Sequence, residues 1–413
     1  PTSAEINEIR SNAPNWMSLV GRILMHPRFL THFERDGQIT KSGAFALTDY
    51  ELEARLTAIF WKSVPDVAGI DAARSGSLRT PAGLKTEVVR ILTHKKAKET
   101  LWTFYQQWLA LSRLPAGNSY SSGPAFDAFA SPYTAAQLDQ NFKEAVVEDT
   151  RQFLEYITFT QNGSLETIFR SPLIFTTNSL VAGIYGVSPR ADAAAAPITD
   201  TSGHFKGILT RPSITQQKPS VNGETNHILR GTFLLENILG FELGQPANFN
   251  EQQGAGIIVP PTASTRTQVN LKTGAGTCAA CHSQINPSGF SLGNFDSLGR
   301  YQTTERRFRI TNGMVDNYAT NPVDATTSLR LNSKIYTIND ADGLVDALFQ
   351  SERIYEGFTA YYFQFSFGRA PLSGLDNALY SNLKTALKTK SVRESLELMA
   401  LLPEFSQVQP AGK

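Results

Sequence analysis

Two cysteines and a histidine lie within five consecutive positions of this 413-residue chain. Cys278 and Cys281 are three residues apart, and His282 directly follows the second cysteine. This CxxCH spacing suits covalent attachment of haem, because two thiols can form thioethers with its two vinyl groups while the adjacent imidazole ligates the iron. The sequence therefore predicts one haem c, attached through Cys278 and Cys281, with His282 as the proximal iron ligand.

Other uses of these thiols fit the sequence less well. A zinc site needs a second pair of nitrogen or sulfur ligands at comparable spacing, and the chain holds no further cysteine. A thioredoxin-like redox pair needs a strand before the motif, whereas Gly274 and Gly276 precede it. The part of the chain before residue 191 shows no nucleophile elbow, phosphate-binding loop or metal cluster, so no catalytic residue is assigned.

The residues that follow the motif can complete such a site. His282 should ligate through Nε2, which leaves Nδ1–H for a hydrogen bond, and a turn at Asn286 and Pro287 can supply a backbone carbonyl as the acceptor. Buried haem propionates need cationic partners, and Arg300 lies soon after the motif. Three further arginines follow it: Arg306, Arg307 and Arg309.

The sixth iron ligand stays open at this level. Met314 lies in the segment TNGMVDN downstream of the motif, and we predict it as the distal ligand because small cytochromes c present a methionine from a loop after the haem helix. The other candidates are His26, His32, His94, His204 and His227, followed by Tyr301 and Tyr318. An iron without a sixth protein ligand would instead bind peroxide or oxygen.

Composition limits the classes of partner. Lys plus Arg number 38 against 37 Asp plus Glu, so the net charge near +1 gives no basis for binding nucleic acid or an anionic membrane surface. No apolar run approaches the roughly 20 residues of a transmembrane helix. Because haem is joined to CxxCH motifs outside the cytoplasm, we expect an exported protein of the periplasm or cell surface whose signal peptide has been removed or is not part of this sequence.

Periodicity predicts a mostly α protein of three modules. Apolar residues at helical spacing and capping signals predict a first helical module over residues 1–190, with helices near 16–25, 49–62, 81–111 and 134–160. An Ala-rich and Pro-containing stretch predicts a linker over 191–203. We expect a haem c module over 204–322 and a C-terminal helical module over 323–413 that packs on it.

The segment CAACHSQINPSGFSLGNFDSLGRYQ resembles the haem-motif segment of the planctomycete-type cytochrome c family, whose usual run is close to CxxCHxxIDPxGFxLENFDxxGxWR. The stretches ALTDYELEARLTAIFWKSVPD, LRTPAGLKTEVVRIL, GILTRPSIT, LRGTFLLENILG and FQFSFGRAPL resemble other parts of that family, in the same order. Among the departures from the pattern, the family's Asp is Asn286 here, and its Glu is Gly293. Among the arginines after the motif, Arg300 is the favoured partner of a haem propionate.

This resemblance implies one haem c, a mostly helical fold and an exported protein, in a family largely described by domains of unknown function. We expect a monohaem cytochrome that transfers electrons to redox partner proteins, which can include other cytochromes, as a subunit of a larger envelope complex. One alternative is a haem peroxidase or oxygenase with an open iron site. The other is a structural or docking subunit in which the haem is accessory.

Overall fold

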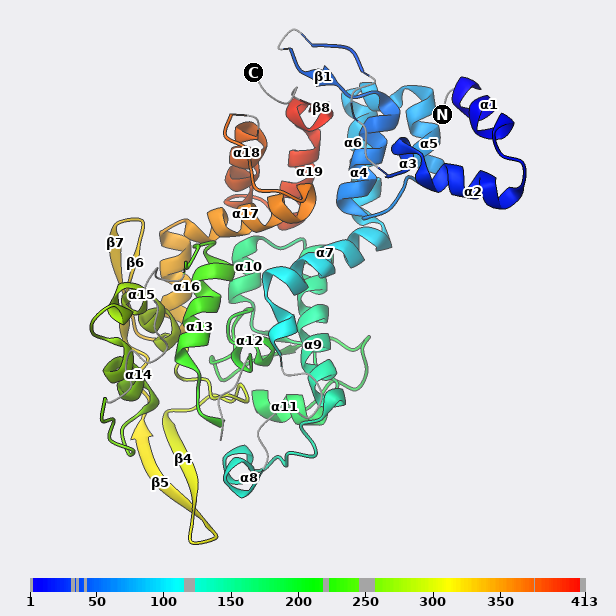
Figure 1. Ribbon diagram of the computed structural model, residues 1–413. Helices are drawn as coiled ribbons and strands as arrows, with labels where there is room; N and C mark the ends of the chain where they lie inside the picture. Colours follow the sequence, from blue (N-terminus) through cyan, green and yellow to red (C-terminus); the bar gives the residue numbers. More distant parts are fainter. Residues whose placement is uncertain are drawn as a thin grey trace. The chain divides into compact units, whose positions relative to one another are not determined.

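The computed structural model describes residues 3–30, 34, 37–40, 43–114, 123–217, 223–244, 257–374 and 376–408. The predicted mostly α fold is confirmed, since helices dominate and the strands are short (Figure 1). Two compact units divide the chain: Pro1–Ile91 together with Met399–Lys413, and Leu92–Leu398. Within the described residues, no helix is both long enough and apolar enough to cross a membrane.

The first unit is built from helices and one short pair of strands. Thr48 and Glu51 form a capping box at the start of α4: the backbone N–H of Thr48 donates to Glu51 Oε2 at 2.8 Å, and the backbone N–H of Glu51 donates to Thr48 Oγ1 at 3.3 Å. Helix α2 has the predicted bounds, and none of its residues is buried. The elements are α1 (Ser3–Ser11), α2 (Trp16–Met25), α3 (Pro27–Leu30), β1 (Phe45–Ala46), α4 (Asp49–Phe60), α5 (Val67–Ser75), most of α6 (Pro81–Thr93), the end of α19 (Val392–Leu401) and β8 (Gln407–Val408).

Helix α4 and the C-terminal segment of the chain hold this unit together. The ring of Phe60 on α4 stacks on Phe405, and both side chains are buried. Strands β1 and β8 pair in antiparallel register, and Arg55 donates to the backbone carbonyls of Phe405 and Gln407 at 2.6 and 3.0 Å. The end of the chain is therefore part of the same core as residues near 50.

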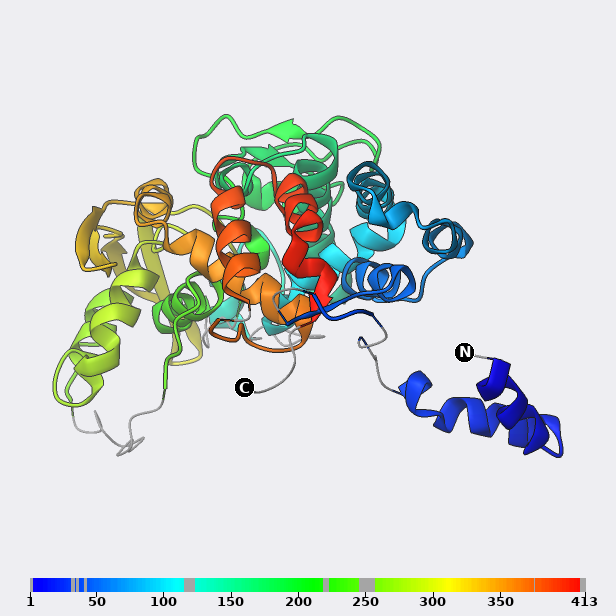
Figure 2. The same ribbon diagram turned by 90° about the horizontal axis from the view of Figure 1, so that it is seen from above.

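The second unit contains the remaining helices and three two-stranded antiparallel sheets among its described residues. Helices α17 and α18 lie side by side in both views (Figures 1 and 2). The helices are α7 (Lys95–Trp108), α8 (Pro124–Ala130), α9 (Gln140–Glu155), α10 (Leu165–Arg170), α11 (Ser179–Tyr185), α12 (Pro212–Thr215), α13 (His227–Phe233), α14 (Thr265–Thr273), α15 (Cys278–Phe290), α16 (Ala341–Gln350), α17 (Arg353–Phe367), α18 (Asn377–Leu387) and the start of α19. The strands are β2 (Leu173–Ile174), β3 (Ile198–Thr199), β4 (Thr304–Thr311), β5 (Met314–Pro322), β6 (Thr327–Leu331) and β7 (Lys334–Ile338).

An aromatic cluster between α7 and α17 forms much of the core of this unit. The ring centroids of Trp108 and Phe358 are 5.0 Å apart, and those of Phe104 and Tyr362 are 5.1 Å apart, both pairs edge to face. Trp108 and Phe358 are fully buried. Edge-to-face pairs add to the stabilisation that burial alone provides, so residues about 250 positions apart in the sequence are firmly packed.

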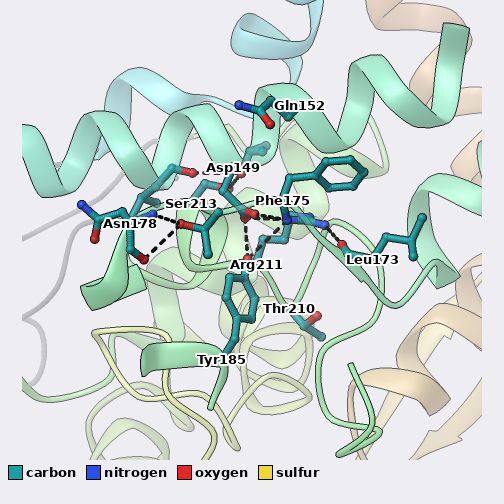
Figure 3. A network of polar contacts seen from close by, with 12 residues as sticks. Asp149, Gln152, Leu173, Phe175, Asn178, Tyr185, Thr210, Arg211 and Ser213 are labelled. Atoms are coloured by element: carbon teal, nitrogen blue, oxygen red, sulfur yellow. Dashed lines mark hydrogen bonds and ion pairs between the residues drawn. The ribbon is translucent and has the colours of Figure 1, made fainter. Parts of the chain in front are cut away.

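A buried ion pair joins α9 to Arg211, the N-cap residue of α12, in the same unit (Figure 3). Arg211 Nη1 lies 2.6 Å from Asp149 Oδ2, and both side chains are almost completely buried. Asp149 also accepts from the Tyr185 hydroxyl at 2.7 Å and from the backbone N–H of Phe175 at 2.8 Å, while Arg211 donates to the Leu173 carbonyl. The aspartate is thus fully hydrogen-bonded, as a buried charge must be.

Three predicted segments differ in detail from the structure. The helix predicted over 81–111 is two helices, because His94 caps α7 by accepting from the backbone N–H of Lys96. The helix predicted over 134–160 begins only at Gln140, after the N-cap Asp139, and ends in a π-helical turn. Residues 191–203, where the sequence predicts a linker, contain strand β3, which pairs with β2 inside the second unit.

Candidate functional site

The two cysteines and the adjacent histidine lie on the first turns of α15. Positions separated by three and four residues share one face of a helix, so Cys278, Cys281 and His282 face the same side. All three side chains are half-buried, and both thiols are free. Two accessible thiols beside an imidazole form a donor set that fits covalent haem attachment.

The zinc alternative finds no support in the geometry. Across the described residues, no group of three or more His, Cys, Asp or Glu side chains is placed to hold a metal ion. Within that part of the chain, Cys278 and Cys281 have no second ligand pair of the kind that a closed tetrahedral site requires.

His282 is oriented by a residue one helical turn further along. Its Nδ1 lies 2.8 Å from Asn286 Oδ1, and the Asn286 side chain is only 3% exposed. Within the described residues, Nε2 of His282 has no hydrogen-bond partner. The acceptor is the side-chain amide oxygen of Asn286, whereas the sequence predicted a backbone carbonyl in this region. The imidazole is thus held through one nitrogen while the other is left to ligate.

Pro287 lies inside α15, where the sequence predicted a turn. The helix continues to Phe290 even though proline lacks the N–H that would bind the carbonyl four residues earlier. That carbonyl belongs to Ser283, an exposed residue, so water can replace the missing donor. Asn286 therefore stays in helical register with His282, which is what permits their side chains to meet.

Helix α13 packs across α15 (Figure 1), and the two backbones come closest at one glycine of each helix. A Cβ atom added at Gly231 would lie 2.0 Å from the carbonyl oxygen of Ile285, and one added at Gly289 would lie 1.8 Å from the carbonyl oxygen of His227. Only residues without a side chain permit such close backbone contact. The crossing fixes the second half of α15 against α13.

Arg230 on α13 holds the segment that follows α15. Its guanidinium donates to the backbone carbonyls of Leu292, Phe295, Asp296 and Thr215 at 2.5–2.9 Å. Burial lowers the pKa of Arg230 to about 10, so the group stays charged at neutral pH. Sequence reasoning did not single out this residue. The sequence feature that could have indicated its buried role is the single arginine in the mostly apolar run LRGTFLL.

Arg300, predicted to bind a haem propionate, has several partners within the protein. It donates to Asp296 Oδ2 at 2.6 Å and to the backbone carbonyls of Phe129, Ala130 and Ser131 at 2.8–3.1 Å. These contacts tie the end of α8 to the segment after the motif. The propionate role of Arg300 stays a prediction, and it would have to compete with these hydrogen bonds.

The other three predicted arginines lie on β4. Arg307 is buried and pairs with Glu224 at 2.6 Å, whereas the pair of Arg309 and Asp316 at 3.2 Å is exposed. Arg306 is exposed and lies over the ring of Phe308. Neighbouring positions on a strand face opposite sides, which separates Arg306 and Arg307.

Met314, the predicted distal ligand, lies at the tip of the β4–β5 hairpin. It pairs with Thr311 across a two-residue turn, and its side chain is 71% exposed. In the view of Figure 1 this tip points away from α15. The structure does not bring Met314 together with His282.

The candidate histidines of the second unit are each engaged elsewhere. His94 caps α7, His204 stacks on Tyr301 with ring centroids 3.5 Å apart, and His227 is buried with Nε2 3.0 Å from Thr265 Oγ1. Burial lowers the pKa of His227 to about 3, so it is neutral. The remaining candidates are Tyr318, which contacts two arginines, His26, which belongs to the first unit, and His32, which lies outside the described residues.

Comparison with protein families matches two stretches of the chain. Residues 47–187 match PSD4, a protein of unknown function (DUF1592), and residues 206–305 match PSCyt3, a protein of unknown function (DUF1588). The second match contains α13, α14 and α15. No curated protein and no solved structure matches the chain. The chain is therefore similar over these two stretches to domain families of the planctomycete-type cytochrome c group.

Proposed function

We propose that this protein is an exported monohaem c-type cytochrome that transfers electrons as part of a larger envelope or cell-surface complex. The observation that carries the proposal is the donor set on α15: two free thiols and an imidazole on one face, with Nδ1 of His282 bound and Nε2 unpaired among the described residues. The match of residues 206–305 to PSCyt3 supports the same assignment.

The residues present fit one covalently attached haem. Cys278 and Cys281 would carry the two thioethers, His282 would ligate the iron, and Asn286 would hold the imidazole. When bound, the haem supplies one-electron chemistry by cycling between ferric and ferrous iron. Pro287 lies within the part of α15 that follows His282, and Arg300 remains the proposed propionate partner.

The half-exposed position of the motif bears on the partners. A redox centre at the surface can exchange electrons with a second protein at short range, so we propose redox partner proteins, other cytochromes among them. The periplasm or cell surface is the proposed location, since covalent haem is joined to this motif outside the cytoplasm.

The test is covalent haem in the full chain exported with a cytochrome c maturation system. We expect haem that survives denaturing electrophoresis in the wild type, and its complete loss in the variant with Cys278→Ala and Cys281→Ala. Met314→Ala is the matched control, because it removes a sulfur without touching the motif. Haem staining retained in the double cysteine variant would refute the assignment.

A second candidate function is peroxide chemistry at an open iron site. The observation that favours it is the placement of the ligand candidates: Met314 lies at an exposed hairpin tip, and His94, His204 and His227 contact other groups. Optical spectra with and without carbon monoxide separate the two functions. Low-spin bands that ignore the gas would support electron transfer, whereas high-spin bands that shift would support an open site.

Met314 is tested in the same experiment. If it ligates the iron, Met314→Ala leaves the haem attached and changes the low-spin spectrum. An unchanged spectrum excludes Met314 and makes peroxide turnover the next measurement.

A further inference from the structure

Helix α14 packs beside α15 (Figure 1). Two of its residues contact Asn286, the residue that holds His282. Asn286 Nδ2 donates to Thr273 Oγ1 at 2.8 Å and lies 3.4 Å from Asn270 Oδ1. Thr273 and Asn270 are both on α14 and face the same side of it, because they are three residues apart. The amide nitrogen of Asn286 is therefore bound by residues of α14, and its amide oxygen faces His282.

The hydrogens of this chain of contacts can be assigned. The Thr273 hydroxyl has one hydrogen, and it donates that hydrogen to the Val269 carbonyl at 2.7 Å. Its oxygen must then accept from Asn286, which fixes the amide with Nδ2 toward α14 and Oδ1 toward His282. An amide oxygen only accepts, so His282 Nδ1 must carry a hydrogen to make the 2.8 Å contact.

We propose that Thr273 and Asn286 act as positioning residues that lock His282 in the Nδ1–H tautomer, so that the Nε2 lone pair is set for a metal before any haem arrives. The iron part of this inference rests on the proposed function. The tautomer part concerns only the protein. Burial of Asn286 matters here, because at 3% exposure water does not compete for either end of its amide.

Helix α14 is itself anchored at its first turn. Thr265 donates two hydrogen bonds to the carboxylate of Glu305 on β4, one from its backbone N–H at 2.8 Å and one from its hydroxyl at 2.6 Å. Arg266 donates to the backbone carbonyls of Asp324 and Thr326, each at 2.7 Å. A carboxylate at a helix N-terminus is stabilising, so these contacts fix the helix that carries Thr273.

The acceptor of the His282 hydrogen is a neutral amide. A carboxylate in the same place would draw the Nδ1 hydrogen more strongly and make the imidazole a stronger electron donor to iron. Ferric iron gains more from such a ligand than ferrous iron does. Asn286 therefore sets a higher reduction potential than Asp would at this position.

The first test uses the full chain without haem, carrying Cys278→Ala and Cys281→Ala and labelled with nitrogen-15 at histidine. Long-range nitrogen–proton spectra at a pH above the ordinary titration range of imidazole report each tautomer, and His282→Phe identifies the signal. We expect the Nδ1–H form. Thr273→Val, which keeps the shape and removes the hydroxyl, should shift the ratio toward Nε2–H by about fivefold, the factor for one typical hydrogen bond.

Thr273→Ser is the matched control, because it keeps the hydroxyl and should keep the wild-type ratio. Two results would overturn the tautomer lock: an Nε2–H signal in the unsubstituted site, or the same ratio in Thr273→Val and Thr273→Ser. Asn286→Leu provides a second way to remove the acceptor, in case Thr273→Val does not fold.

The second test is a redox titration of the haem-loaded chain. Asn286→Asp should lower the reduction potential; a tenfold gain in ferric over ferrous affinity equals about 59 mV for one electron. Haem attached with an unchanged potential in Asn286→Asp would overturn the tuning role alone. Absence of covalent haem from the wild type would overturn the proposed function and leave the tautomer result standing.

Discussion

Removal of Asp149 should be one of the most damaging single changes in the second unit. Its side chain is 1% exposed and accepts three hydrogen bonds, from Arg211, Tyr185 and the Phe175 backbone (Figure 3). Asp149→Ala leaves the buried Arg211 charge without a counter-ion, and Arg211 Nε already has no partner among the described residues. Breaking a buried pair in this way costs about 3–5 kcal/mol, and we expect the upper half of that range.

The assay is urea unfolding followed by circular dichroism, with a double-variant cycle. Asp149→Leu combined with Arg211→Met removes both charges. The double variant should lose much less stability than the sum of Asp149→Leu alone and Arg211→Met alone, with a coupling energy of about 2 kcal/mol or more. Asp149→Asn keeps the shape and serves if Asp149→Ala does not fold. Asp71→Ala breaks an exposed ion pair with Arg74 and is the control, expected to cost at most about 1 kcal/mol. A loss below about 1 kcal/mol for Asp149→Ala, or additive single changes, would refute the reasoning.

Two further predictions concern other parts of the chain. Burial, and then repulsion from Glu87, raises the pKa of Glu53 from 4.5 to about 8. Between pH 4.5 and about 8, Glu53 therefore keeps its proton in the folded state and has lost it in the unfolded state. The free energy of unfolding should fall as the pH rises through this range. Glu53→Gln should remove this part of the pH dependence, which denaturant unfolding at several pH values measures; an unchanged slope would contradict the raised pKa. Gly231→Ala should lower the free energy of unfolding by about 3 kcal/mol or more, because the added Cβ would lie 2.0 Å from the Ile285 carbonyl oxygen. Gly21→Ala, in the open interior of α2, should instead gain up to about 1 kcal/mol, and equal effects of the two changes would rule out the close crossing.

The β4–β5 hairpin shows a signal in the sequence that our prediction did not use. Asn312 and Gly313 both have positive φ angles and form the two-residue turn between the strands. An Asn-Gly pair is the strongest short-range sign of such a hairpin. The strands are mostly exposed, so no apolar alternation marks them. Met314 consequently lies on a strand at a hairpin tip, where a haem-facing loop was expected.

Local chemistry let the sequence determine the motif and much of the helical content by itself. The spacing of Cys278, Cys281 and His282 is given directly by the order of residues in the chain, and on a helix it places all three on one face. Helix α2 and the Thr48–Glu51 capping box depend on residues within one or two turns, which a sequence pattern contains. These features therefore needed no knowledge of distant contacts.

The tertiary structure alone decided which groups meet across the chain. Thr273 reaches Asn286, Arg230 reaches the carbonyls after α15, and Arg211 reaches Asp149, because helices distant in sequence pack together and exclude water. A buried polar group must find a partner, but the sequence does not say which one, since many candidates of equal chemistry lie along the chain. That Nε2 of His282 is the nitrogen proposed to ligate was expected from chemistry. The amide that holds the ring, and the threonine that orients the amide, follow only from the packing of α14 on α15.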